Sequence, residues 1–174
     1  NYSEHRISPY SHPENYSIKY EFDGIYWKGA RFTTDNTFKG GHSAEVRDVS
    51  HSQDPGLQYT GKIPVEHGVP YTLTWAARTR EMDQEYTVLI EAFDAEGNWL
   101  ASQNKLKIYK GSTSWKEESF TVEQGFHHAA RTLSVAFFPI FRTEDGRNTG
   151  TACFDEIKIV RGASNDNLLL NGGF

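Results

Sequence analysis

Arg78 and Glu91 are the first candidates for a binding site, because each stands in a stretch where polar and apolar residues alternate. The stretches 71–80 and 86–94 place an apolar residue at every second position, and side chains on a β-strand point alternately to its two faces. Arg78 and Glu91 fall on the less apolar faces. If adjacent strands carry them, they face outward together and offer a hydrogen-bond donor and an acceptor to a ligand. The alternative is a cross-strand ion pair without a ligand.

Asp155 is the next residue whose surroundings demand a partner. It lies beside Phe154 in the stretch 153–160, whose composition predicts a buried strand. A buried carboxylate needs either a cation or hydrogen-bond donors to offset its lost hydration. The sequence alone leaves open whether Asp155 holds a metal or has a capping or ladder role without one.

Motifs for catalysis are absent from the sequence. It contains no G-x-S-x-G or H-E-x-x-H motif, no P-loop and no dinucleotide-binding glycine pattern. His127 and His128 are too close in sequence for two ligands on one helix face, and Glu117 and Glu118 would point to opposite faces of a strand. We therefore expect no enzymatic activity, although a small lyase or hydrolase acting alone remains an alternative.

Composition restricts the partners further. The 174 residues include 18 Lys+Arg and 23 Asp+Glu, a formal net charge of −5, and one cysteine, Cys153. A mildly acidic chain is a poor general binder of nucleic acid or of anionic membranes, and no apolar run reaches the roughly 18 residues of a membrane helix. A single cysteine excludes an internal disulfide. Aromatic residues make up 14% of the chain, which indicates a folded domain rather than disorder.

Strand signals dominate the sequence and helix signals are nearly absent. The candidate strands are short, regularly spaced and bounded by Gly, Pro, Asn or Asp; they are 16–22, 30–32, 44–49, 57–65, 71–80, 86–94, 100–108, 115–122, 133–138 and 153–160. Many short strands without crossover helices predict an all-β protein, an antiparallel β-sandwich.

The end of the chain predicts a domain boundary. Residues 1–162 form one sandwich in this interpretation, and 163–174 comprise a polar connector and the start of a following module. The apolar run Leu168, Leu169 and Leu170 is unfavourable in water on its own. It therefore favours the first strand of a module that continues beyond this segment. A last strand of the same domain is the alternative.

Several segments together resemble the jelly-roll carbohydrate-binding modules of the CBM4/CBM9/CBM16/CBM22-like, galactose-binding-like group. The segments that carry the resemblance, in the family's order, are 40–43 (GGHS), 61–78 (GKIPVEHGVPYTLTWAAR), 93–97 (FDAEG), 114–122 (SWKEESFTV) and 150–157 (GTACFDEI). The tail 167–174 (NLLLNGGF) looks like the opening strand of a second such module. The chain departs from the family at its beginning, where the usual opening strand is not clear.

The resemblance implies a non-catalytic module that holds an attached glycoside hydrolase or polysaccharide lyase against its polymer. Sugars present apolar C–H faces flanked by hydroxyls, so aromatic rings stack on them while charged side chains bond the hydroxyls. The carbohydrate-binding candidates are therefore Arg78, Glu91, Trp27, Tyr26, Tyr59 and Arg142. One of Tyr26 and Trp27 is expected to be core, and the loop of Arg142 could simply be solvated. We expect Trp75 and Trp115 in the core.

The resemblance also implies a structural calcium ion remote from the sugar. Its ligands would be Asp155, an acidic residue of the first strand region (Asp23, or Glu21 as the alternative) and the early glycine-rich turn with Gly41 and Ser43. Calcium takes several carboxylate and carbonyl oxygens, which this set provides.

The partners expected from the resemblance are a polysaccharide or oligosaccharide and a neighbouring catalytic domain in the same chain, outside the cell or on its surface in a bacterial-type secreted protein. We expect no nucleic-acid and no membrane partner. A spacer of the same fold that packs against a catalytic domain without binding a ligand is the competing hypothesis. The sequence does not name the polymer.

Overall fold

The computed structural model describes residues 4–9, 16–20, 27–35, 37–48, 55–80, 85–101, 104–139, 150–170 and 172–174, and for β1 and β2 only the backbone. Within these residues the chain forms strands and turns and no helix. No helix long and apolar enough to cross a membrane occurs in the described part of the chain.

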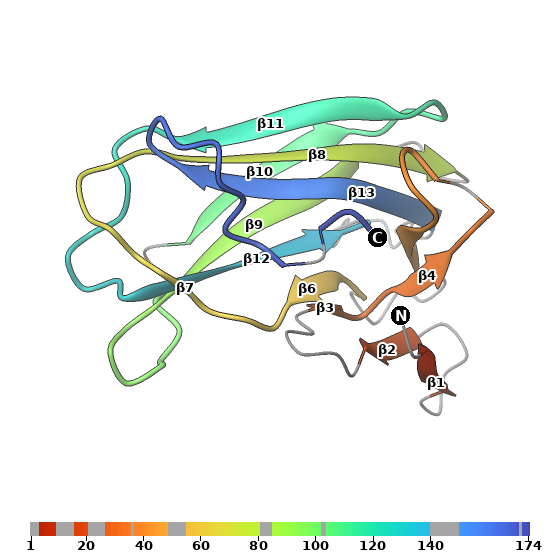
Figure 1. Cartoon of the computed structure of the whole chain (residues 1–174), viewed down its shortest axis with the longest axis horizontal. Coiled ribbons are helices and arrows are strands. Elements are labelled where there is room, and N and C mark those ends of the chain that lie inside the picture. The colour runs from red at the N-terminus through yellow and green to blue at the C-terminus, as the bar shows by residue number, and fades with distance from the viewer. Residues whose placement is uncertain are drawn as a thin grey trace, which may run out of the picture.

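Most strands belong to two antiparallel sheets that pack as two layers (Figure 1). The β9 sheet has the order β10–β9–β12–β6–β3, with β7 paired to β12; its strands are Lys105–Lys110 (β10), Glu85–Phe93 (β9), Thr132–Phe138 (β12), Leu57–Tyr59 (β6), Trp27–Lys28 (β3) and Ile63–Pro64 (β7). The β8 sheet has the order β11–β8–β13–β5–β4; its strands are Lys116–Val122 (β11), Tyr71–Arg80 (β8), Gly150–Arg161 (β13), Ser43–Asp48 (β5) and Arg31–Thr33 (β4). A separate antiparallel pair joins β1 (Glu4–Pro9) and β2 (Tyr16–Tyr20). The all-β antiparallel sandwich predicted from the sequence is confirmed.

The core lies between the two sheets and is built from the apolar positions of the alternating stretches. Trp75 is buried, as predicted, and its indole Nε1 donates a hydrogen bond of 2.9 Å to the hydroxyl of Tyr86. The ring of Tyr109 meets Trp75 edge-on at 4.8 Å, and the hydroxyl of Tyr109 donates to the carbonyl of Ser119 at 2.6 Å. Trp75 and Ser119 lie on the β8 sheet while Tyr86 and Tyr109 lie on the β9 sheet, so these bonds hold the sheets together.

Consecutive strands β8 and β9 belong to different sheets. β8 pairs with β11 and β13, whereas β9 pairs with β10 and β12. Their apolar faces meet in the core, and their other faces point to opposite sides of the sandwich. We call these two surfaces the β8 face and the β9 face.

The C-terminal segment, described at residues 167–170 and 172–174, packs against this sandwich along the second half of β13. The amide of Leu168 donates to the carbonyl of Ile159 at 2.9 Å, and the amide of Ile157 donates to the carbonyl of Gly172 at 2.7 Å. Asn167 accepts hydrogen bonds from the amides of Ile159 and Leu169 through its Oδ1. The segment thus runs antiparallel to β13 beyond the point where the pairing of β13 with β5 ends.

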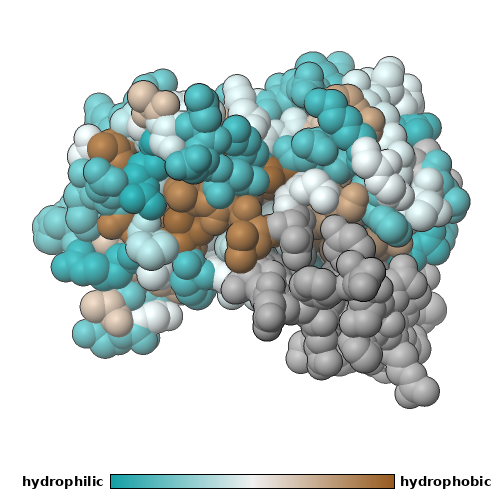
Figure 2. All heavy atoms as spheres, in the orientation of Figure 1, coloured by the Kyte–Doolittle hydropathy of each residue, from teal (hydrophilic) through white to brown (hydrophobic). Residues whose placement is uncertain are grey.

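The same segment also reaches the β9 sheet. The indole of Trp27 on β3 donates to the carbonyl of Leu170 at 2.8 Å, its ring meets Phe174 at 5.6 Å, and Leu169 is buried in the core. Figure 1 shows the segment lying between the two layers, and Figure 2 shows apolar side chains gathered where it crosses. These contacts agree with the alternative that 167–174 is a strand of this domain. That a following module starts here stays a prediction.

Candidate functional site

The β9 face carries the best candidate site. Because Val88, Ile90 and Ala92 are buried in the core, the residues between them on β9 point outward. Glu91 is one of them, and it lies directly opposite Ser134 of β12; the next outward pair is Phe93 with Thr132. Directly opposite residues of an antiparallel pair share a face, so β9 and β12 present a carboxylate, an aromatic ring and two hydroxyl side chains together.

Two lysines, Lys62 and Lys28, lie near enough to Glu91 to act on its charge. The ammonium of Lys62 lies 3.1 Å from the centroid of the Phe93 ring, a cation–π contact. Partial burial raises the pKa of the Glu91 carboxyl, while the positive charges of Lys62 and Lys28 act in the opposite direction. Burial also lowers the pKa of Lys62, against the effect of Glu91. The three charges are therefore close enough to influence each other in a partly dehydrated environment.

An exposed tryptophan borders this cluster. Trp99 forms an antiparallel bridge with Phe93 and is 56% exposed, so its ring lies on the same side of the hairpin as Phe93. The hairpin is held by Asp94, whose carboxylate accepts hydrogen bonds from both nitrogens of Asn98 and from the amide of Glu96. These bonds, from Asn98 above all, lower the pKa of Asp94. The turn that carries Trp99 is thus fixed in shape before any ligand arrives.

The middle of the β9 face is lined by small side chains. Ser134 and Ala136 of β12 point outward yet are buried, and the hydroxyl of Ser134 donates to the carbonyl of Tyr59 at 2.5 Å. Gln58 of β6 lies opposite Ala136, and Lys28 of β3 lies opposite Gln58. Across the sheet, the outward residues therefore change from small or polar ones in the centre to a lysine at the β3 edge.

The other edge of the face is apolar. Leu106 and Ile108 of β10 lie opposite Leu89 and Thr87 of β9, and both are about half exposed. The polar cluster around Glu91 and the apolar pair on β10 thus occupy the same surface at different positions along β9.

The structure corrects the prediction that Arg78 and Glu91 form one wall. Arg78 points outward from β8, opposite Cys153 of β13, and so lies on the β8 face, while Glu91 lies on the β9 face. The reason is the connection between the strands: β8 and β9 follow each other in the chain but enter different sheets. A cross-strand ion pair between the two is excluded for the same reason.

Trp27 and Tyr59 are also wrong as carbohydrate contacts. Trp27 is 2% exposed and Tyr59 is 7% exposed, and their rings meet at 5.1 Å inside the core. The indole of Trp27 is held by the carbonyl of Leu170, and the amide of Leu170 donates to the hydroxyl of Tyr59. Both side chains are turned inward by the C-terminal segment. The predictions for Tyr26 and Arg142 lie outside the described residues.

Asp155 meets its need for partners through backbone donors. One carboxylate oxygen accepts the amides of Phe38 and Lys39, each at 3.0 Å, and the other accepts the amide of Glu156 at 2.7 Å. These three N–H groups are the hydrogen-bond donors that a buried carboxylate needs.

The described residues do not test the calcium site implied by the resemblance, because Asp155 is the only one of its expected carboxylate ligands among them. No group of three or more His, Cys, Asp or Glu side chains that could hold a metal occurs among the described residues. Ser43 is fully buried on β5 and Gly41 is exposed in the turn before it. Asp23, the expected first-strand ligand, and its alternative Glu21 lie outside the described residues, so calcium stays a prediction.

Several residues of the candidate site were not among the predicted contacts: Lys28, Lys62, Phe93, Trp99 and Ser134. The alternation in 86–94 already placed Phe93 on the same face as Glu91. Lys62 precedes β7 rather than belonging to an alternating stretch, and the pairing of Ser134 with Glu91 depends on the order of the strands in the sheet.

The two-layer antiparallel arrangement is the jelly-roll β-sandwich of carbohydrate-binding modules, and solved structures confirm the resemblance seen in the sequence. The chain is similar to the CBM22-1 xylan-binding domain of Paenibacillus barcinonensis Xyn10C, with a TM-score of 0.56 and 12% identity over 80% of this chain and 88% of that one. It is similar to a family 16 carbohydrate-binding module, with a TM-score of 0.53 and 12% identity over 78% of this chain and 86% of that one.

A third similar structure is a larger enzyme. The arabinose-bound GH51 α-L-arabinofuranosidase MgGH51 matches with a TM-score of 0.53 and 14% identity over 78% of this chain and 23% of its own length. No family model matches the sequence, and no curated protein matches it. At these identities the similarity establishes the fold.

Proposed function

We propose that the chain is a non-catalytic carbohydrate-binding module and that it binds a polysaccharide through the β9 face. The observation that carries this proposal is the cluster on that face: a half-buried Glu91 carboxylate between Lys62 and Lys28, beside the Phe93 ring and the exposed Trp99. A carboxylate and ammonium groups accept and donate hydrogen bonds to sugar hydroxyls, and an exposed indole stacks on the apolar face of a pyranose ring.

The fold supports the same role. The similar structures include modules named for xylan binding and for carbohydrate binding in general, and one arabinofuranosidase in which the matched part is a fraction of the chain. We extend the proposal accordingly: the module is joined to a carbohydrate-active enzyme, acts outside the cell where polymeric substrates lie, and increases the local concentration of that enzyme on its polymer.

Affinity electrophoresis of the whole chain against xylan, a mixed-linkage glucan, galactan and arabinan tests the proposal. We expect at least one of these polymers to retard migration. Trp99→Ala should then weaken binding about fivefold to tenfold, because a stacked ring contributes on the order of 1 kcal/mol. Trp99 is exposed, so the melting temperature should stay nearly unchanged.

A matched control is Leu170→Ala, which shortens another exposed apolar side chain away from the β9 face. It should leave binding unchanged. If none of the polymers retards the wild type, the chain is a spacer of the same fold and the proposal is wrong. Turnover of any polymer by the isolated chain would instead identify an enzyme.

A further inference from the structure

The β8 face, on the opposite side of the sandwich, concentrates arginine. One row across the strands contains Arg31 of β4, Glu45 of β5, Cys153 of β13 and Arg78 of β8, which are successive cross-strand partners. The next row contains Arg47, Thr151 and Arg80 in the same way. Because neighbouring strands lie about 4.7–4.9 Å apart, four guanidinium groups share a small surface, which we call the arginine patch: Arg31, Arg47, Arg78 and Arg80.

Among the described residues, these two rows contain four arginines and one carboxylate, that of Glu45. Glu45 is almost buried and pairs with both Arg80 at 2.9 Å and Arg31 at 3.5 Å, so one carboxylate serves two arginines. The thiol of Cys153, 3.9 Å from Glu45, adds no negative charge, because burial and the nearby Glu45 raise its pKa to about 12. The side chains of Arg80 and Arg31 are 43% and 38% exposed, and Arg47 is also exposed.

Aromatic rings border the patch. Trp115 directly precedes β11, where the register places it beside Arg78, and its ring meets Phe38 at 5.7 Å. The sequence predicted Trp115 in the core, but it is only half-buried and lies on the outward side of the β8 sheet. Asp155, two positions along β13 from Cys153, is neutralised in part by the three backbone amides described above.

We infer that the arginine patch is a second binding surface, and that its ligand is an acidic polysaccharide carrying uronate carboxylates. Guanidinium groups bind carboxylates with two parallel hydrogen bonds, and four arginines on β4, β5 and β8 can meet several carboxylates of one polymer. The adjacent Trp115 and Phe38 offer apolar ring surface to the sugar itself. This inference is independent of the β9 face.

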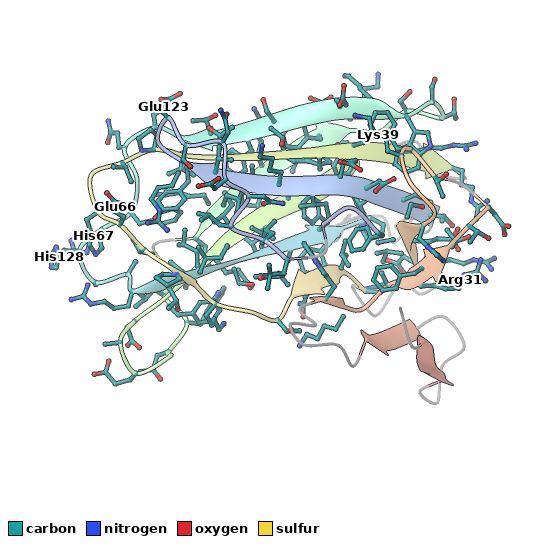
Figure 3. All side chains as sticks on the ribbon, in the orientation of Figure 1. Arg31, Lys39, Glu66, His67, Glu123 and His128 are labelled. Atoms are coloured by element: carbon teal, nitrogen blue, oxygen red, sulfur yellow. The ribbon has the colours of Figure 1, made fainter. Side chains whose placement is uncertain are left out.

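Nucleic acid is the less suitable polyanion. The chain has a net charge of −5, and the continuous phosphates of a duplex would meet the acidic remainder of the surface. Figure 3 shows that Arg31, a member of the arginine patch, lies at the opposite end of the molecule from His67 and His128.

Affinity electrophoresis of the whole chain with polygalacturonate, at low ionic strength, tests the inference. We expect retardation by polygalacturonate and little by the same polymer after full methyl esterification, which keeps the sugars and removes the charges. Arg47→Gln and Arg80→Gln should each weaken binding about tenfold, because each removes a charge-assisted hydrogen-bond donor. Added salt should weaken it further.

Arg131→Gln is the matched control, since Arg131 is exposed beside His67 at the other end and its loss changes the net charge equally. It should bind like the wild type. Arg47→Gln should leave any retardation by the neutral polymers unchanged, which separates this surface from the proposed site on the β9 face. Absence of retardation, unchanged affinity in Arg47→Gln, or equal binding to duplex DNA would each overturn the inference.

Discussion

The ammonium group of Lys62 lies 3.1 Å from the centroid of the Phe93 ring, on the same face of the sandwich as Glu91. A lysine in this position covers aromatic surface that would otherwise be open to a sugar. It also provides positive charge next to a carboxylate whose pKa is raised by burial. The same side chain thus controls access to the ring and the ionisation of its neighbour.

Lys62→Ala should therefore raise the pKa of Glu91 further, since the positive charge of Lys62 favours the ionised carboxylate. The measurement is an NMR titration of the Glu91 side-chain carboxyl carbon in the variant and the wild type. Lys62→Arg is the control, because it keeps the charge and should leave the titration nearly unchanged. An identical midpoint in Lys62→Ala would show that the two groups do not interact.

Glu91→Gln should change how stability depends on pH. The pKa of Glu91 is raised in the folded protein, so the folded state binds a proton more tightly than the unfolded state. Its contribution to stability is complete below the unfolded pKa, about 4.3, and is lost as the pH rises through the folded value. The glutamine variant lacks this loss. Its free energy of unfolding should therefore rise relative to that of the wild type as the pH increases from 4 to 7. Urea denaturation across that range measures the difference; parallel curves would contradict the raised pKa.

The alternation of residues predicted correctly which face of each strand is buried. Trp75 and the other apolar positions of 71–80 lie in the core, as do those of 86–94. This succeeded because the period of two belongs to the strand itself and needs no knowledge of its neighbours. The jelly-roll fold was also predicted correctly from the resemblance and strand spacing.

The alternation of residues does not predict which strands pair with each other in a sheet. Arg78 and Glu91 stand in consecutive strands, and only the sheet order shows that they point to opposite sides. The burial of Trp27 depends on the carbonyl of Leu170, near the other end of the chain. Two of the three donors to Asp155 are the amides of Phe38 and Lys39, far away in sequence. Each of these depends on long-range contacts that a local pattern does not contain.

Asp155→Ala should destabilise the sandwich by about 2–4 kcal/mol, because three backbone amides lose a charged acceptor. Urea denaturation of the variant measures this loss. Thr33→Ala is the control, since the neutral hydroxyl of Thr33 accepts the amide of Asp35 at 3.1 Å, and we expect a loss of about 1 kcal/mol or less. A neutral result for Asp155→Ala would contradict the anchoring role.

Chelation separates the anchoring role of Asp155 from the calcium implied by the resemblance. The amide donors account for the buried carboxylate without a metal, so EDTA should leave the melting temperature of the wild type unchanged. Magnesium-saturated EDTA, which still binds calcium but leaves the ionic composition nearly constant, controls for salt effects. A melting temperature that falls with EDTA and recovers with added calcium would establish the metal site instead.

Gly172→Ala should detach the C-terminal segment from β13. A Cβ atom at Gly172 would lie 1.9 Å from the carbonyl oxygen of Ile157, and that oxygen belongs to the backbone and cannot turn aside. We expect a loss of at least about 2 kcal/mol in the free energy of unfolding. Gly173→Ala is the matched control, because its Cβ would meet only the flexible carboxylate of Glu156 at 3.2 Å, and it should stay within about 1 kcal/mol of the wild type. Equal stability of the two variants, measured by urea denaturation, would show that 167–174 does not hold the two sheets together.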